Sequence, residues 1–237
     1  MKAIILAGGK GTRLAPYTTI LPKPLLPVGE KPILEIVIRQ LVHFGFDNIT
    51  LAVGHLSGLI EAYFGDGKRF EAKISYSRED KPLGTAGPLS LIDGLDETFL
   101  VMNGDILTDI NLSDMLKFHR LRKATATMAV YEKTVDIDLG VLELDSDKWI
   151  SNYIEKPKYK YNVSTGIYIF EPSIHEYLTR GSKIDLPTLI LEMLKKGDRV
   201  AAFHLNGYWL DIGRHEDYEI ANSEFKINPE KFIPRFK

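Results

Sequence analysis

The amino-acid sequence predicts an α/β fold built on a doubly wound, mixed β-sheet, and two patterns carry that prediction. In the first half, short apolar strand-like segments alternate with helix-like segments, which is typical of parallel β-α-β units. In the second half, several strand-like segments follow one another, which indicates strand pairs. The chain shows no linker, internal repeat or low-complexity stretch, so we expect a single domain over 1–237 with halves at about 1–122 and 123–237.

The first half is expected to hold four strands joined by helices. Its first strand, Ile4-Ile-Leu-Ala7, is wholly apolar, as in a strand buried on both faces. Its first helix is amphipathic and is closed by Gly45. The predicted strands are 4–7, 48–53, 73–77 and 98–102, and the predicted helices are 32–44, 59–64 and 87–92.

The second half is expected to hold more strands than helices. Segments 140–144 and 149–154 favour a hairpin because they lie close together in the chain. Gly197 follows the next-to-last helix as a stop signal. The predicted strands are 124–131, 140–144, 149–154, 166–170 and 200–205, and the predicted helices are 186–195 and 215–225.

Composition and charge narrow the class of protein. The balance of 44% hydrophobic and 26% charged residues is typical of a globular protein. A net charge of −2 provides no basic field for nucleic acid, and no apolar run approaches the ~20 residues that span a bilayer. The absence of cysteine excludes disulfides, thiolate metal sites and cysteine nucleophiles. We expect a cytoplasmic enzyme or binding protein without nucleic-acid or membrane partners; a homo-oligomer is left open.

A glycine-rich loop follows the first strand, with the sequence Gly8-Gly-Lys-Gly-Thr-Arg13. Its glycines let backbone N–H groups approach a polyanion closely, and Arg13 adds a planar, permanently charged donor. The spacing matches neither G-x-G-x-x-G nor a loop ending in Gly-Lys-Ser/Thr. The sequence therefore predicts a phosphate-binding loop of a third kind.

Two aspartates follow later apolar segments. Asp105 ends the motif Asn103-Gly-Asp, and Asp211 lies in Trp209-Leu-Asp-Ile-Gly213. Ligands of parallel sheets bind beyond the carboxyl ends of the strands, where two carboxylates and substrate phosphates can hold Mg²⁺. Taken singly, Asp105 fits a turn residue and Asp211 fits a helix cap. Their combination with the glycine loop favours a metal site.

Two lysines stand out because a proline follows each of them. Lys23 precedes Pro24, and Lys156 precedes Pro157, which restricts the lysine backbone to extended geometry. Such ammonium groups suit phosphate oxygens, although most lysines are simply solvated. Glu155 could accept hydrogen bonds from sugar hydroxyls or pair with a nearby cation. The six histidines show no metal-ligand spacing, and the chain has no Gly-x-Ser-x-Gly elbow, so zinc sites and hydrolytic triads are disfavoured.

Taken together, segment 8–27 closely resembles the signature of the sugar-1-phosphate nucleotidyltransferases. Later pieces occur in the order of that family: Leu83-Gly-Thr-Ala-Gly87, Asn103-Gly-Asp105, Glu155-Lys-Pro157, Ser164-Thr-Gly166 and Trp209-Leu-Asp-Ile-Gly213. The resemblance implies a Rossmann-like, three-layer αβα fold with a nucleotide-binding first half and a sugar-phosphate-binding second half. Some members continue into a β-helix of hexapeptide repeats; we expect none here, because only a short tail follows the catalytic region.

The same resemblance implies roles for individual residues. Gly8, Gly9, Gly11 and Arg13 would hold the triphosphate, with Arg13 on the departing pyrophosphate. Lys23 would contact the nucleotide phosphates, Asp105 and Asp211 would bind Mg²⁺, and Lys156 would hold the sugar phosphate. Glu155 would contact sugar hydroxyls, and Gly140, Thr165 and Gly166 would line the sugar pocket. The remaining nucleotide-binding candidates are Leu6, Ala7, Thr12, Glu79, Gly84 and Thr85.

The expected reaction joins a nucleoside triphosphate (NTP) and a sugar 1-phosphate into a nucleotide sugar with release of pyrophosphate. The motifs look most like those of mannose-1-phosphate guanylyltransferases, which implies GTP and mannose 1-phosphate or a related sugar phosphate. A uridylyl-, thymidylyl- or cytidylyltransferase is the close alternative. A non-catalytic nucleotide-sugar sensor could lose Arg13, Asp105, Lys156 or Asp211, yet all four are present. A dehydrogenase would need an acidic residue after the second strand, where Val53-Gly-His55 stands instead.

Overall fold

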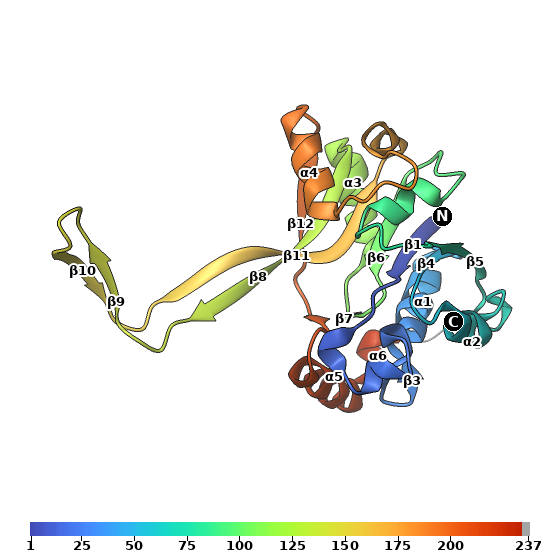
Figure 1. The fold of residues 1–237 in the computed structure, drawn as a ribbon, viewed down its shortest axis with the longest axis horizontal. Coiled ribbons are helices and arrows are strands. Elements are labelled where there is room, and N and C mark those ends of the chain that lie inside the picture. The colour runs from blue at the N-terminus through green and yellow to red at the C-terminus, as the bar shows by residue number, and fades with distance from the viewer. Residues whose placement is uncertain (234–237) are drawn as a thin grey trace.

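The computed structural model describes residues 1–233, and a seven-stranded sheet forms its centre (Figure 1). The strand order is β12-β8-β11-β6-β1-β4-β5. β11 is antiparallel to both β6 and β8, whereas every other neighbouring pair is parallel. The strands are β1 (Lys2–Ala7), β4 (Asn48–Val53), β5 (Lys73–Arg78), β6 (Phe99–Asn103), β8 (Ala126–Asp136), β11 (Lys158–Phe170) and β12 (Val200–His204). The predicted mixed α/β sheet is confirmed.

Helices cover both faces of this sheet because neighbouring strand residues point to opposite sides. Ile5 packs with α1, α2 and α3, whereas Ile4 faces α4 and two 3₁₀ segments. A third cluster joins α5 and α6 to the segment after the glycine loop. The helices are α1 (Ile33–His43), α2 (Ser57–Phe64), α3 (Leu112–Arg122), α4 (Leu186–Lys195), α5 (His215–Ile227) and α6 (Pro229–Phe232). The 3₁₀ segments are Thr12–Leu14, Tyr17–Thr19, Lys23–Leu25, Lys68–Phe70, Gly87–Leu91 and Pro172–Tyr177.

Three short ladders complete the fold, and two of them correct the sequence prediction. β7 (Ile106–Thr108) pairs with β13 (Trp209–Asp211), and neither strand was predicted. β2 (Pro27–Val28) pairs with β3 (Lys31–Pro32) and was also missed. The expected hairpin is confirmed as β9 (Val141–Leu144) against β10 (Ile150–Ile154).

Other corrections concern α3 and two element types. The sequence analysis assigns no helix to 112–122, yet α3 forms there, and Asn111 Oδ1 caps it by accepting from the Asp114 N–H at 3.1 Å. The helix expected at 87–92 is a 3₁₀ segment, and the strand expected at 166–170 is only the buried end of β11. The last residues of the predicted domain, 234–237, lie outside the described residues.

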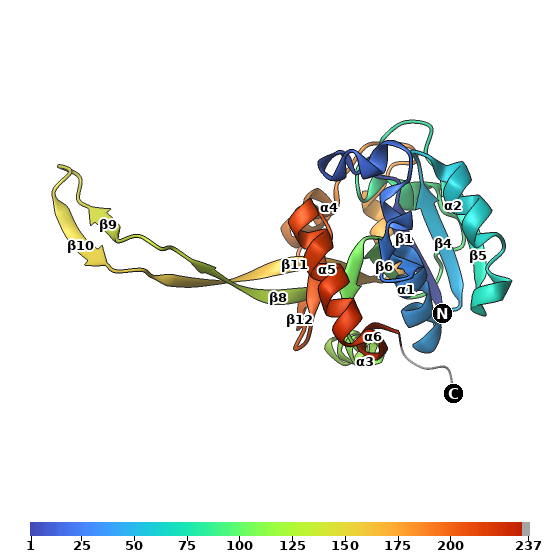
Figure 2. The same ribbon diagram turned by 90° about the horizontal axis from the view of Figure 1, so that it is seen from below.

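β8 and β11 extend far beyond the sheet as a two-stranded ribbon that carries β9 and β10 at its end (Figures 1 and 2). We call residues 131–163 the arm and the rest of the described chain the body. β12 pairs with β8 only as far as Val130, and β6 pairs with β11 only from Ile167 onward. The arm therefore has no third strand from the central sheet.

None of the helices within residues 1–233 is both long and apolar enough to cross a membrane.

Met115→Ala should destabilise the protein by about 2–5 kcal/mol, because the side chain is fully buried in α3 against the sheet. Leu121→Ala on the same helix is the matched control: Leu121 is 82% exposed, so its loss should change stability by at most about 0.5 kcal/mol. Urea unfolding followed by circular dichroism measures both. Equal effects of the two substitutions would contradict the packing of α3.

Candidate active site

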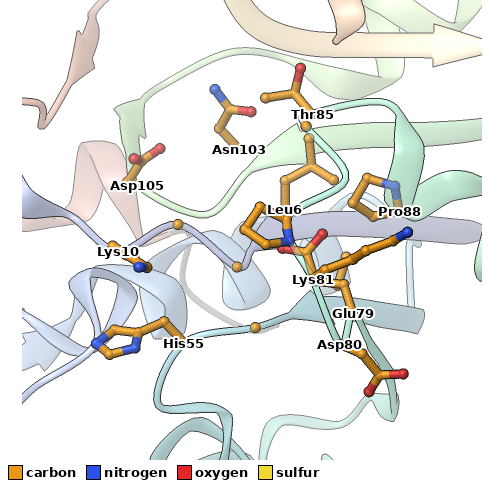
Figure 3. A pocket seen from close by; sticks show the side chains of 16 residues that line it. Leu6, Lys10, His55, Glu79, Asp80, Lys81, Thr85, Pro88, Asn103 and Asp105 are labelled. Atoms are coloured by element: carbon orange, nitrogen blue, oxygen red, sulfur yellow. The ribbon is translucent and has the colours of Figure 1, made fainter. Parts of the chain in front are cut away.

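A cavity of about 700 Å³ lies at the carboxyl ends of β1, β4, β5 and β6. This position is expected, because the chain reverses its direction of winding between β6 and β1 and leaves a crevice there. Figure 3 shows Leu6 near its centre, with Thr85 and Asn103 across from His55. The lining residues are Leu6, Gly8, Gly9, Lys10, Ala52, Gly54, His55, Glu79, Asp80, Lys81, Pro82, Gly84, Thr85, Pro88, Asn103 and Asp105.

The glycine loop forms one wall of this cavity, and its packing explains the need for glycine. A Cβ on Gly8 would lie 2.9 Å from Glu79 Oε1, so a side chain there would displace the carboxylate. Glu79 Oε2 accepts a hydrogen bond from the Leu83 N–H at 3.0 Å. The Glu79 carboxylate thus holds the loop after β5 against the glycine loop.

A second loop, at residues 83–87, is fixed to the start of α4. Gly84 has a φ of 78°, and a Cβ there would lie 2.6 Å from the Ile184 carbonyl oxygen. The Thr85 hydroxyl accepts from the Leu186 N–H at 2.8 Å, while the Thr85 N–H donates to Asp185 Oδ1 at 3.0 Å. These bonds join the two sequence halves beside the cavity.

Three charged residues meet next to the glycine loop. Lys23 Nζ forms an ion pair with Asp105 Oδ2 and lies 3.9 Å from Asp211 Oδ1. The two aspartates come together because β13 pairs with β7, and the Ile212 N–H donates to the Asp105 carbonyl at 3.1 Å. A Cβ on Gly11 would lie 3.1 Å from Lys23 Cβ, so the loop packs tightly against this lysine.

The ionised form of the Asp211 carboxylate is disfavoured in this cluster. Burial, followed by the neighbouring Asp105 carboxylate, raises the pKa of Asp211, and the Lys23 and Arg13 cations oppose that rise. Arg13 approaches from the other side, where a Cβ on Gly213 would lie 3.4 Å from its guanidinium. Arg13 also lines a separate hollow with Arg214, His215 and Glu216. Additional positive charge near Asp211 would favour its ionised form.

The donor set fits Mg²⁺ bound together with a substrate. Two carboxylates close enough to share one ammonium group would share a hard divalent cation equally well, and Mg²⁺ completes its oxygen shell with phosphates and water. Within residues 1–233 there is no cluster of three or more His, Asp or Glu side chains that would hold a metal by protein ligands alone.

A smaller groove of about 230 Å³ adjoins the cavity and shares Thr85 and Asn103 with it. Gly166 is required at its base: its φ is 77°, and a Cβ would lie 2.5 Å from Asn103 Nδ2. Trp209 Nε1 donates to the Thr165 carbonyl at 2.9 Å and closes one side. The groove is lined by Thr85, Asn103, Ser164, Thr165, Gly166, Tyr168, Leu186, Pro187, Trp209 and Asp211.

The structure brings most of the sequence-predicted site residues to these two adjoining hollows. Gly11, Arg13 and Lys23 line neither of the two, although Lys23 pairs with the lining residue Asp105. Gly140, Glu155 and Lys156, which the sequence assigns to the sugar side of the site, lie on the arm and also line neither hollow. Ala7 is buried at the end of β1, and Thr12 begins the 3₁₀ turn at the end of the glycine loop, so neither lines the two hollows. The incomplete part of the predicted site is therefore its sugar-phosphate side.

Several lining residues were not proposed from the sequence. They include Lys10, His55, Lys81, Asn103, Tyr168 and Trp209. A usable signal existed for His55 and Asn103, which follow or end parallel strands, the position already used to find Asp105. Tyr168 and Trp209 had no comparable local signal.

Comparison with known proteins decides the family. The nucleotidyl transferase family model matches residues 2–227. The chain is a member of the nucleotidyl transferase family. A UTP–glucose-1-phosphate uridylyltransferase of Synechocystis sp. is 39% identical over 92% of this chain, and the catalytic subunit beta of a mannose-1-phosphate guanylyltransferase of Danio rerio is 37% identical over 92%. The chain spans 61% and 62% of the lengths of these two relatives.

Solved structures of similar proteins show the same fold. A putative glucose-1-phosphate thymidylyltransferase from Bacillus anthracis, in complex with a sucrose, superimposes with a TM-score of 0.78 at 26% identity, covering 94% of each chain. HddC from Yersinia pseudotuberculosis, complexed with GMP-PN, gives a TM-score of 0.71 at 25% identity over 94% of this chain and 99% of its own. The match covers the sheet together with its flanking helices.

Asp211→Asn should stabilise the protein at pH 7. Folding raises the pKa of Asp211, so the folded protein loses stability as the pH rises through that value and the carboxylate ionises. Asparagine carries no charge and avoids this loss. The gain in stability should disappear at pH values below 3.8, the ordinary pKa of aspartate, because the carboxyl group is then neutral in the folded and in the unfolded protein. Urea titrations from pH 3 to pH 8 without divalent cations measure the effect. A gain that is the same at all pH values would contradict this electrostatic explanation.

Proposed function

We propose that this protein is a sugar-1-phosphate nucleotidyltransferase, which converts an NTP and a sugar 1-phosphate into a nucleotide sugar and pyrophosphate. The cluster of Lys23, Asp105 and Asp211 beside the glycine loop carries the proposal, because it places opposite charges at the edge of a nucleotide-sized cavity. Membership of the nucleotidyl transferase family supports it.

In the proposed reaction, an oxygen of the sugar phosphate attacks the α-phosphorus of the NTP. The bond from that phosphorus to the bridging oxygen breaks, and pyrophosphate leaves with the electron pair. The attacking oxygen is already anionic, so the reaction needs no general base. The protein must instead align the two phosphates in line and neutralise charge.

The first half, at about 1–122, is proposed to hold the nucleotide. Gly8, Gly9 and Gly11 admit the triphosphate to the backbone N–H groups of the loop, and Arg13 stabilises charge on the departing pyrophosphate. Lys23 contacts the nucleotide phosphates. Leu6, Ala7, Thr12, Glu79, Gly84 and Thr85 complete the proposed nucleotide side.

Asp105 and Asp211 are proposed to hold Mg²⁺ with the substrate phosphates, where the ion supplies additional positive charge when bound. Lys23, released from its ion pair with Asp105, is then free to turn toward phosphate oxygens. This exchange would account for the position of one lysine between two aspartates.

The second half, at about 123–237, is proposed to hold the sugar phosphate. Thr165 and Gly166 line the groove beside Asp211, and Lys156, Glu155 and Gly140 on the arm supply its remaining contacts. The groove adjoins the nucleotide cavity through Thr85 and Asn103, so the two substrates would meet at Asp105 and Asp211.

GTP with mannose 1-phosphate, or a related sugar phosphate, is the proposed substrate pair. The relative from Danio rerio is named a mannose-1-phosphate guanylyltransferase, and HddC was solved in complex with GMP-PN. The Synechocystis relative is a uridylyltransferase of glucose 1-phosphate, which favours UTP and glucose 1-phosphate as the second candidate pair.

A pyrophosphate-release assay with four NTPs against a panel of sugar 1-phosphates tests the proposal. At least one pair should turn over with Mg²⁺ present, EDTA should abolish the rate, and added Mg²⁺ should restore it. No turnover with any pair would overturn the proposed function, while a rate unaffected by EDTA would overturn the metal role of Asp105 and Asp211.

Arg13→Ala should lower kcat by about 10²-fold or more, since it removes a donor aimed at charge that develops in the transition state. Arg180→Ala is the matched control, because Arg180 pairs with Asp93 at the surface and lies outside both hollows. Steady-state kinetics with the best substrate pair provide the comparison. Similar losses in the two variants would remove Arg13 from its assigned role.

A further inference from the structure

The arm is a two-stranded ribbon that carries its tip away from the body. Seven consecutive residue pairs join its strands, from Ser164 with Val130 to Lys158 with Asp136. Such a ladder spans about 20 Å beyond the sheet. Cross-strand ion pairs, Lys158 with Asp136 and Lys160 with Glu132, lie along it.

The proposed sugar-phosphate residues lie just beyond this ladder, in a prearranged group. The Tyr153 hydroxyl donates to Glu155 Oε2 at 3.0 Å, and a Cβ on Gly140 would lie 2.2 Å from that hydroxyl oxygen. Gly140 is therefore the residue that admits the tyrosine beside Glu155. Lys156 follows in a left-handed conformation with a φ of 45°, and it forms no ion pair with any residue among 1–233. Its ammonium group is available to an anion.

The arm exposes many large apolar side chains to solvent. Leu139 and Trp149 are each 73% exposed, and Ile150 is 63% exposed. The other large apolar side chains exposed on the arm are Val135, Leu142, Leu144, Tyr153 and Tyr161. A two-stranded ribbon is marginally stable alone in water, and a run of exposed apolar side chains marks an interaction surface.

The groove in the body has no positively charged residue among its described lining residues. Among the described residues that line the groove beside Trp209, Asp211 is the only charged one. A sugar phosphate in that groove would face a carboxylate without a cation from the groove itself. Lys23 and Arg13 act on Asp211 from the glycine-loop side, whereas the remaining candidate cation, Lys156, is on the arm, where the ladder from Lys158 to Ser164 separates it from the groove of its own body.

We propose that the arm of one copy closes over the active site of a second copy, so that Glu155 and Lys156 serve the groove of the partner. The arrangement is reciprocal, as in a two-fold dimer that exchanges identical elements. Each closure buries the apolar side chains of the arm and brings an ammonium group to the anionic substrate. The inference rests on the proposed function, because it assigns Lys156 to the sugar phosphate of that reaction.

A complementation experiment tests the exchange. Asp105→Asn damages the body, whereas Lys156→Ala damages the arm. Both variants alone should lose at least about 10²-fold in rate. Co-expressed with different tags and purified as a mixed dimer, they should regain about half of the wild-type rate, because one of the two sites joins an intact body to an intact arm.

The control is a mixed dimer of Asp105→Asn with Asp211→Asn. Both substitutions lie in the body, so every site is damaged and the rate should stay at the level of the single variants. An inactive Asp105→Asn/Lys156→Ala dimer, or an active wild-type protein that is monomeric, would overturn the exchange. Wild-type protein without activity on any substrate pair would instead overturn the proposed function.

Trp149 gives a readout that does not depend on catalysis. The chain has two tryptophans, so the difference between wild type and Trp149→Phe isolates the emission of Trp149. At concentrations where the enzyme is active, acrylamide should quench this emission at least about twofold less than that of free tryptophanamide, because the side chain is covered by the partner. Quenching equal to that of the free amide would show an uncovered arm and overturn the proposal.

Discussion

The contact of Lys23 with Asp105 and Asp211 is the constraint on which the rest of the site depends. It forces three distant segments to one point: the turn after the glycine loop, the end of β6 and strand β13. Two carboxylates so close together repel, and the lysine offsets that repulsion. Around this point the sheet supplies rigidity, since its central strands are buried on both faces.

The central sheet was predictable because its signals are local. The continuous apolar run of β1 and the hairpin signal of β9 and β10 each lie within a few neighbouring residues. The same holds for the glycine loop and for Asp105, which follows a strand end. The sequence of α3 also predicts a helix, because the capping residue Asn111 precedes the apolar residues Leu112, Met115 and Leu116. Polar residues between them make the helix less clearly amphipathic.

What escaped prediction depends on contacts between distant segments. The pairing of β7 with β13 joins short strands whose own sequences do not specify a partner, and it alone sets Asp211 beside Asp105. The direction of the arm also depends on contacts far from it in the sequence. The sequence places Lys156 correctly just after a strand, but no residue near Lys156 determines in which direction that strand extends from the body. Motif order predicts which residues belong to a site, whereas only the backbone path decides which molecule's site they reach.

Strand β11 joins two regions of opposite character. From Thr165 to Phe170 it is buried, and it contributes both to the core and to the groove, whereas from Lys158 to Ser164 it is mostly exposed. Substitutions in the outer part cost little folding free energy, while those in the inner part endanger the whole sheet. Under the proposed function, the arm could therefore vary in its sugar contacts while the charged cluster in the body stays unchanged. One strand thus contains both residues that can be substituted with little loss of stability and residues that the fold requires.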